Sequence, residues 1–202
     1  MTNLLKNIIK IYYKIFFRIS ISGEDNLPID EGYVLCANHI SAHDPTVYAV
    51  SVKKLLYALG KKELFKGFIG NFLFSNMNVI PVDRNKIDIS AMKKSLRILK
   101  KEKSGLLIFA EGTRNHGINP LPATPGASML AIKAKVPIIP LSIDSSYKLF
   151  SKVNIKIGKP IDLSDYNSKE MDTQDYIKIN EDILKDIYNN LELYKKGKNY
   201  GN

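Results

Sequence analysis

Short apolar runs alternate with longer amphipathic segments along most of this chain. Runs of strand length, bounded by turn residues, occupy residues 32–38, 55–60, 78–84, 105–114, 136–144 and 152–161, the run at 105–114 continuing into a loop. Segments with apolar residues at helical spacing occupy residues 44–54, 88–103, 125–135 and 173–196. Because strands and helices alternate, the pattern predicts an α/β fold: a single-domain α/β sandwich with a mostly parallel mixed sheet.

The first 19 residues differ, because a positive charge interrupts their apolar sequence at every fourth position. On a helix these charges form a narrow basic stripe beside a wide apolar face; they are Lys6, Lys10, Lys14 and Arg18. The pattern predicts an amphipathic helix over residues 1–19 that lies in an anionic membrane surface, ahead of a domain over residues 20–202. Alternatively, the helix packs on the domain's own core and its lysines are solvated. Deletion of residues 1–19 is expected to release the protein from anionic vesicles.

The composition adds a strong positive charge. Lys and Arg number 30 against 20 Asp and Glu, which gives a formal net charge of +10. Such a charge suits anionic partners, but the chain has no nucleic-acid-binding motif and no aromatic-interleaved basic patch, so nucleic acid is not expected. The one cysteine, Cys36, lies in an apolar run. It indicates a buried structural thiol, a reducing compartment, and no disulfide or multi-cysteine metal site.

Polar side chains follow the predicted strand at 32–38, in the sequence NHISAHD. A neutral imidazole suits general-base chemistry, and a carboxylate bonded to its second nitrogen would fix its tautomer. His43 is adjacent to Asp44, so their side chains diverge, and we interpret His43 as a solvated or capping residue. His39 would lie about 140° from Asp44 on a continuous helix, but the two can meet if residues 39–43 form a turn. The spacing therefore favours His39 as the base and Asp44 as its partner.

The sequence offers no protein nucleophile to accompany this base. It contains no GxSxG motif, and its cysteine lies inside a predicted strand. A base at His39 would therefore act on a hydroxyl of the substrate, which points to direct transfer to an alcohol. Arg84 and Arg114 each follow a predicted strand and could hold a phosphate through two hydrogen bonds. Alternatively, these arginines are solvated, or one of them pairs with Glu111.

Four blocks, NHISAHD, IPVDR, FAEGTRN and VPIIP, occur in an order and at intervals that resemble the glycerolipid acyltransferase family. The most similar members are the 1-acylglycerol-3-phosphate acyltransferases, or lysophosphatidic acid acyltransferases, and the resemblance covers roughly residues 20–160. It implies a glycerol-3-phosphate acyltransferase-like fold at a membrane surface. By matched position, it implies His39 as the general base and Asp44 as its partner in the His-x4-Asp motif. The residues implied in binding the acceptor phosphate and shaping the site are Arg84, Glu111, Gly112, Thr113 and Arg114.

The resemblance also implies the reaction. A fatty acyl group would pass from acyl-CoA or acyl carrier protein to the free hydroxyl of 1-acylglycerol 3-phosphate, giving phosphatidic acid for phospholipid synthesis. No metal or other cofactor is expected. Expected partners are membrane lipids, the acyl donor and lysophosphatidic acid, at the cytoplasmic face of the cell membrane. The alternatives are another acceptor, such as glycerol 3-phosphate or another lysophospholipid, and a non-catalytic basic membrane-binding module.

Three positions depart from the family's pattern. Asn78 stands where glycine is common, Ala110 where proline is common, and Thr124 where lysine is usual. Asparagine tolerates the left-handed backbone conformation better than most residues, so we expect the turn at Asn78 to be kept. The missing lysine at position 124 leaves the identity of the acceptor open.

Overall fold

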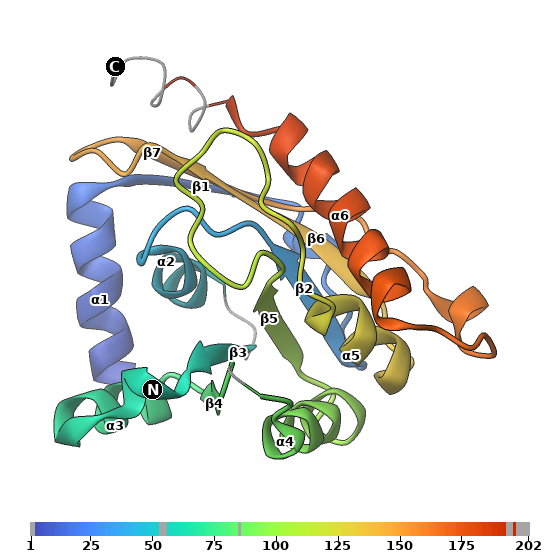
Figure 1. The fold of residues 1–202 in the computed structure, drawn as a ribbon. Helices are drawn as coiled ribbons and strands as arrows, with labels where there is room; N and C mark the ends of the chain where they lie inside the picture. The colour runs from blue at the N-terminus through green and yellow to red at the C-terminus, as the bar shows by residue number, and fades with distance from the viewer. Residues whose placement is uncertain (1–2, 53–55, 85, 193–195, 197–202) are drawn as a thin grey trace.

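Seven strands form one sheet through the middle of the molecule (Figure 1), in a computed structural model that describes residues 3–52, 56–84, 86–192 and 196. In spatial order they are β1 (Arg18–Ser22), β7 (Lys152–Ile157), β6 (Ile138–Ser145), β2 (Tyr33–Ala37), β5 (Gly105–Phe109), β3 (Leu56–Lys61) and β4 (Val79–Val82). Five of the six neighbouring pairs are parallel, and the β6–β7 pair is antiparallel. The predicted mixed, mostly parallel sheet is therefore confirmed.

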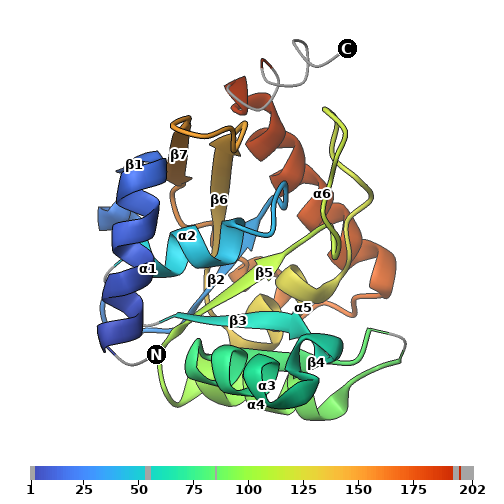
Figure 2. The same cartoon turned by 90° about the vertical axis from the view of Figure 1, so that its left-hand side faces the viewer.

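Helices cover both faces of this sheet (Figures 1 and 2). One face carries α1 (Asn3–Phe16) and α2 (Asp44–Ser51), and the other carries α4 (Ile89–Lys100), α5 (Gly126–Ala134) and α6 (Thr173–Asn189). A further helix, α3 (Gly67–Asn76), packs beside β4 and was not predicted from the sequence. The described residues also form short 3-10 helices, which are η1 (Glu24–Asn26), η2 (Lys62–Phe65) and η3 (Ser164–Tyr166). The α/β sandwich is thus confirmed as three layers.

The central strand β2 is apolar throughout because it is buried on both faces, as expected for the middle of a parallel sheet. Val34 and Cys36 pack among residues of α4, α5 and α6, whereas Leu35 and Ala37 pack on the side of α1 and α2. Burial raises the pKa of the Cys36 thiol to about 12. Cys36 therefore stays a protonated core side chain, as the sequence indicated.

The predicted helix over residues 1–19 is too long at its C-terminal end. The helix α1 ends at Phe16, and residues 18–22 form the edge strand β1, which pairs in parallel with β7. The reason is local alternation: Ile19 and Ile21 pack against the core, while the residues between and beside them are exposed. The predicted domain boundary after residue 19 therefore falls inside a strand. Residues 1–2 lie outside the described part of the chain.

The other predicted helices differ from the observed ones at their ends, most of all in two segments. The segment predicted over 173–196 is helical as α6 to Asn189, is interrupted at 190–191 and is helical again at residues 192 and 196, while residues 193–195 lie outside the described part. The segment predicted over 44–54 is helical as α2 to Ser51, and residues 53–54 lie outside the described part. Neither difference affects which face of the sheet the helix covers.

Candidate active site

The turn after β2 starts at a fixed point because Asn38 anchors it. The buried Asn38 side chain donates a hydrogen bond to the Ile143 carbonyl and accepts one from the Ile143 N–H, both at 2.9 Å. These bonds continue the pairing of β2 with β6 beyond the end of β2. Ile40, two residues further on, is buried in the core on the α4–α6 face. The chain is therefore held on both sides of His39.

Asp44, the first residue of α2, is fully buried and accepts four hydrogen bonds. Its Oδ2 accepts from His39 Nδ1 at 2.8 Å and from the backbone N–H groups of Ile40 and Ser41, each at 2.7 Å. Its Oδ1 accepts from the hydroxyl of Tyr147 at 2.8 Å. Residues 39–43 thus form a turn tight enough to bring the imidazole onto the carboxylate.

This geometry orients the His39 ring. An ionised carboxylate only accepts hydrogen bonds, so Nδ1 of His39 carries the proton in its bond to Asp44. A neutral ring then keeps its lone pair on Nε2, the nitrogen that can take up a proton. The ring stacks on Phe109, with centroids 4.0 Å apart, and 16% of the His39 side chain is exposed. The arrangement has the form of an oriented base that solvent or a substrate can reach.

The interpretation of His43 as a solvated or capping residue is right about its position and wrong about its side chain. His43 occupies the N-cap position of α2, but its side chain makes no capping hydrogen bond. Instead, Nδ1 is hydrogen bonded to the Tyr13 hydroxyl at 2.9 Å, and the ring stacks on Tyr147 with centroids 5.3 Å apart. The half-buried ring is therefore held between α1 and the loop after β6.

Glu111 follows β5 and is almost fully buried. Its Oε2 accepts from the His39 N–H at 3.0 Å. Its Oε1 accepts from Asn115 Nδ2 at 2.7 Å, from the Tyr188 hydroxyl at 2.9 Å and from the Leu121 N–H at 3.0 Å. These donors are all neutral groups. They come from the turn after β2, the loop after β5 and α6, so the carboxylate joins these three segments. Its position fits a residue that shapes the site.

Arg84 follows β4 and reaches the loop after β5, where its Nη1 donates a hydrogen bond to the Gly112 carbonyl. The preceding residue, Asp83, forms an ion pair with Lys62 at 2.6 Å, and its N–H donates to the Asp88 carboxylate at 3.0 Å. Arg84 itself is exposed. Its guanidinium therefore stands at the surface, beside the loop that the sequence links to phosphate binding.

The loop after β5 turns at Gly112, which has a φ of 66° and donates its N–H to the Phe109 carbonyl at 3.0 Å. Thr113 and Arg114 come next, and both are exposed. The N–H of Asn115 then donates to the His39 carbonyl at 2.7 Å, which ties the loop to the turn after β2. Two hydrogen-bonded groups of predicted site residues meet through this loop: His39 with Asp44 and Glu111, and Arg84 with Gly112.

The three departures from the family's pattern each have a local explanation. Asn78 has a φ of 57°, so the expected left-handed turn is confirmed. Ala110 donates its N–H to the Ala37 carbonyl at 3.1 Å, a bond that proline could not make. Thr124 donates its hydroxyl to the Ala110 carbonyl at 2.9 Å, and its methyl group would lie 2.8 Å from a Cβ at Gly112. Thr124 thus braces the loop that carries Gly112.

The sequence prediction misses two tyrosines that complete the site from distant parts of the chain. Tyr147 bonds to Asp44 across 103 positions, and Tyr188 bonds to Glu111 across 77. The one signal for Tyr147 is its place just after a predicted strand, at the edge where the ends of parallel strands meet. Within residues 3–52, 56–84, 86–192 and 196, no group of three or more His, Cys, Asp or Glu side chains could hold a metal ion.

Comparison with known protein families gives a match over most of the sheet. The family model described as "Acyltransferase" matches residues 18–144. A Bacillus subtilis protein named 1-acyl-sn-glycerol-3-phosphate acyltransferase is 30% identical over 167 residues, which cover 79% of this chain and 82% of that protein. A Streptococcus pneumoniae protein of the same name is 32% identical over 142 residues, 67% of this chain. The match covers only 52% of the Streptococcus protein, about half of its length.

The fold also resembles a solved structure. The crystal structure of PlsC from Thermotoga maritima, titled a 1-acyl-sn-glycerophosphate (LPA) acyltransferase, superposes with a TM-score of 0.71. The superposition covers 92% of this chain and 77% of the Thermotoga chain, at 23% sequence identity. At that identity the likeness establishes the arrangement of helices and strands and nothing finer.

Proposed function

Because this chain belongs to the acyltransferase family, we propose that it transfers a fatty acyl group from a thioester to the free hydroxyl of 1-acylglycerol 3-phosphate. The product would be phosphatidic acid, and the donor acyl-CoA or acyl carrier protein. The observation that carries this proposal is the His39–Asp44 hydrogen bond at 2.8 Å, which leaves Nε2 of a partly exposed ring to act as a base. The names of the Bacillus and Streptococcus relatives support the choice of acceptor.

In this mechanism, Nε2 of His39 takes the proton of the acceptor hydroxyl as its oxygen attacks the thioester carbonyl. The C–O ester bond forms, the C–S bond breaks, and the proton passes from His39 to the departing thiolate. Asp44 keeps the ring in the required tautomer and stabilises the imidazolium that forms. The negative charge that develops on the thioester carbonyl oxygen during the attack requires hydrogen-bond donors as well. The proposal includes no metal and no cofactor.

The acceptor phosphate would bind beside this base, on the exposed side chains around the loop after β5. Arg84 reaches this loop through its bond to Gly112, and Thr113 and Arg114 lie on it. A guanidinium matches two phosphate oxygens at once, and hydrogen bonds between charged groups are the stronger ones. Glu111 takes no phosphate in this scheme, because its two oxygens already accept four internal hydrogen bonds.

An acceptor panel tests this function. Release of free thiol from acyl-CoA and from acyl carrier protein would be measured with lysophosphatidate, glycerol 3-phosphate, a zwitterionic lysophospholipid or no acceptor. We expect rapid release with lysophosphatidate, matched by phosphatidate formation, and little release without an acceptor. Equal thiol release with and without acceptors would contradict transfer to an alcohol. Faster release with glycerol 3-phosphate would move the assignment to that acceptor.

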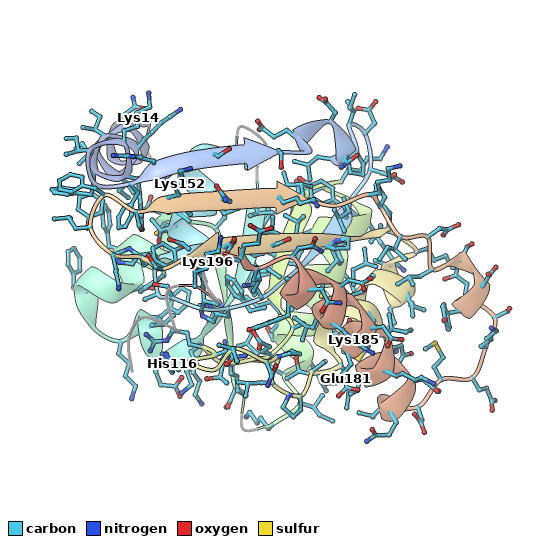
Figure 3. All side chains as sticks on the ribbon, turned by 90° about the horizontal axis from the view of Figure 1, so that it is seen from above. Lys14, His116, Lys152, Glu181, Lys185 and Lys196 are labelled. Carbon is cyan, nitrogen blue, oxygen red and sulfur yellow. The ribbon has the colours of Figure 1, made fainter. Side chains whose placement is uncertain are left out.

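The N-terminal helix supports a position at the membrane, which we propose to be the cytoplasmic face. One side of α1 packs on the domain through Tyr13, whereas a second apolar stripe has 44–58% of each side chain exposed; it consists of Ile8, Ile11, Tyr12 and Ile15. Lys10 and Lys14 are exposed between these two sides, and Lys14 lies at the outer edge of the molecule in Figure 3. The exposed stripe is then the face that enters the lipid, and the lysines meet anionic headgroups.

No helix within the described residues is long and apolar enough to cross a bilayer. The contact that we propose is one that α1 makes while lying in the membrane surface. The side chains of residues 3–6, including Lys6 of the predicted basic stripe, lie outside those described.

A further inference from the structure

Among the described contacts of the Asp44 carboxylate, Tyr147 is the one side chain that bonds to Oδ1. The other three donors, His39 Nδ1 and two backbone N–H groups, all bond to Oδ2. Asp44 is fully buried, so without Tyr147 its second oxygen would have to find another donor inside the protein. The tyrosine hydroxyl therefore acts on the carboxylate from the side opposite His39.

The backbone of Tyr147 adopts a conformation that bulky residues rarely take, with a φ of 51°. Ser145 holds it there, because its Oγ accepts from the Tyr147 N–H at 2.9 Å and donates to the Lys152 carbonyl at 2.8 Å. A strained backbone persists where the surrounding structure fixes it, and such positions cluster at functional sites. The loop after β6 is thus built to hold this side chain in one place.

The ring of Tyr147 is held by two aromatic side chains as well. It stacks on His43, with 24° between the ring planes, and it packs edge-on against Phe17. His43 is in turn hydrogen bonded to Tyr13, which is 3% exposed on the inner side of α1. A continuous path of contacts therefore leads from α1 to the carboxylate.

We propose that Tyr147 is a positioning residue for Asp44, and that His43 and Tyr13 hold Tyr147 in place, so that α1 supports the base as well as the membrane contact. The inference deepens the proposed function, since it concerns how His39 is kept oriented. The phenol donates throughout the neutral pH range, because burial and the nearby Asp44 charge raise the pKa of Tyr147.

The physical effect on His39 is electrostatic. The hydroxyl hydrogen of Tyr147 draws negative charge toward Oδ1 and so weakens the pull of Asp44 on the imidazole proton. Titratable groups reach this pair from several elements: Tyr147 from the loop after β6, Glu111 through the His39 N–H, His43 from the start of α2, and Tyr13 from α1 behind it. Removing the Tyr147 hydroxyl alone should strengthen the His39–Asp44 bond and leave the other groups unchanged.

The test is Tyr147→Phe, which keeps the ring on His43 and removes only the hydroxyl. The chain has three histidines, so the Nδ1–H resonance of His39 can be assigned in 15N-histidine-labelled protein by its absence in His39→Ala. We expect this resonance to move to lower field in Tyr147→Phe. In the acyl-transfer assay, the acid limb of the kcat/KM profile should move to higher pH because the His39–Asp44 bond is stronger. We also expect kcat to fall about tenfold with little change in KM, because the Asp44 carboxylate loses the contact at Oδ1 that fixes its orientation.

Tyr57→Phe is the matched control. Tyr57 also donates to a carboxylate at 2.8 Å, that of Glu102, but near the surface and outside the site. This variant should leave both the His39 resonance and kcat unchanged. Tyr13→Phe, which removes the bond to His43, should move the resonance in the same direction as Tyr147→Phe but by less, and it provides the test if Tyr147→Phe does not fold.

A folded Tyr147→Phe protein with the wild-type His39 resonance and the wild-type kcat would overturn the positioning role. A Tyr57→Phe variant that reproduced its effects would do the same. The resonance is measured without any substrate, so it tests the inference even if the wild-type protein transfers no acyl group. A wild-type protein that transfers no acyl group would instead overturn the proposed function.

Discussion

Glu111 joins the turn that carries His39 to the loop that carries Gly112. Glutamine at this position keeps one acceptor oxygen but turns an N–H2 group toward the His39 N–H, so two donors would face each other. We predict that Glu111→Gln lowers the free energy of unfolding by about 1–3 kcal/mol, the cost of a buried group left without its partner. Denaturant unfolding monitored by circular dichroism measures this difference.

Tyr188→Phe provides the comparison at the same carboxylate. It removes one donor to Oε1 and leaves the His39 N–H bond in place. The expected cost is about 1 kcal/mol. If Glu111→Gln were no less stable than Tyr188→Phe, the bond from the His39 N–H would not be holding the turn.

Parts of the site follow from the sequence because they are local. The spacing of His39 and Asp44 suffices to predict their contact once residues 39–43 are taken as a turn, and the hydrogen bond agrees. The contact of Tyr147 with Asp44 and the burial of His43 join segments far apart in the chain, and no local sequence pattern indicates them. The roles of the predicted site residues in catalysis and phosphate binding stay predictions until variants are measured.

At the scale of the element, α1 has two apolar sides with different tasks. We predict that replacing Ile8, Ile11 and Ile15 together by Gln leaves the fold intact, because these side chains are more than half exposed and Gln is a good helix former. Binding to anionic vesicles should weaken about a hundredfold, from about 1 kcal/mol of lost apolar burial per side chain. Liposome flotation measures the binding, and thermal unfolding checks the fold.

This variant is a better test than deletion of residues 1–19, since that deletion would also remove Arg18 and Ile19 from β1. A matched change on the packed side, Tyr13→Phe, should leave flotation unaffected because Tyr13 is buried against the domain. Undiminished flotation of the triple variant would show that another surface makes the membrane contact.

The two elements that were not predicted from the sequence, β1 and α3, lack a clear hydrophobic periodicity. The strand β1 directly follows α1, and its isoleucines continue the apolar spacing of the helix, so the two merge in the sequence. The helix α3, with the sequence GFIGNFLFSN, contains two glycines and has no polar face to mark it. By contrast, α4 and α6 have polar and apolar faces and capping aspartates at Asp88 and Asp172, and both were predicted.

At the scale of the whole molecule, the net charge of +10 should make a salt-dependent contribution to the free energy of binding to anionic membranes. The screening length falls from about 10 Å at 0.1 M salt to about 3 Å at 1 M. We predict that flotation with anionic vesicles decreases over this range, while the weaker flotation with neutral vesicles does not. Flotation with anionic vesicles that is unchanged by salt would contradict the electrostatic contribution.

The architecture itself is predictable because alternating strands and helices leave few ways to bury both faces of a sheet. The buried runs of β2, β5 and β6 are the segments where the sequence is least ambiguous, and they form the middle of the sheet. The order of the remaining strands, with β1 and β4 at the edges, depends on pairings that composition and periodicity do not specify.

The central claim is that His39, held by Asp44, is the base that activates the acceptor hydroxyl. Its most direct test is the rate of lysophosphatidate-dependent thiol release by His39→Ala, with circular dichroism to establish that the variant is folded. We expect this rate to fall at least about a thousandfold, since a positioned general base contributes rate factors of this order. A folded His39→Ala protein that releases thiol at close to the wild-type rate would contradict the claim.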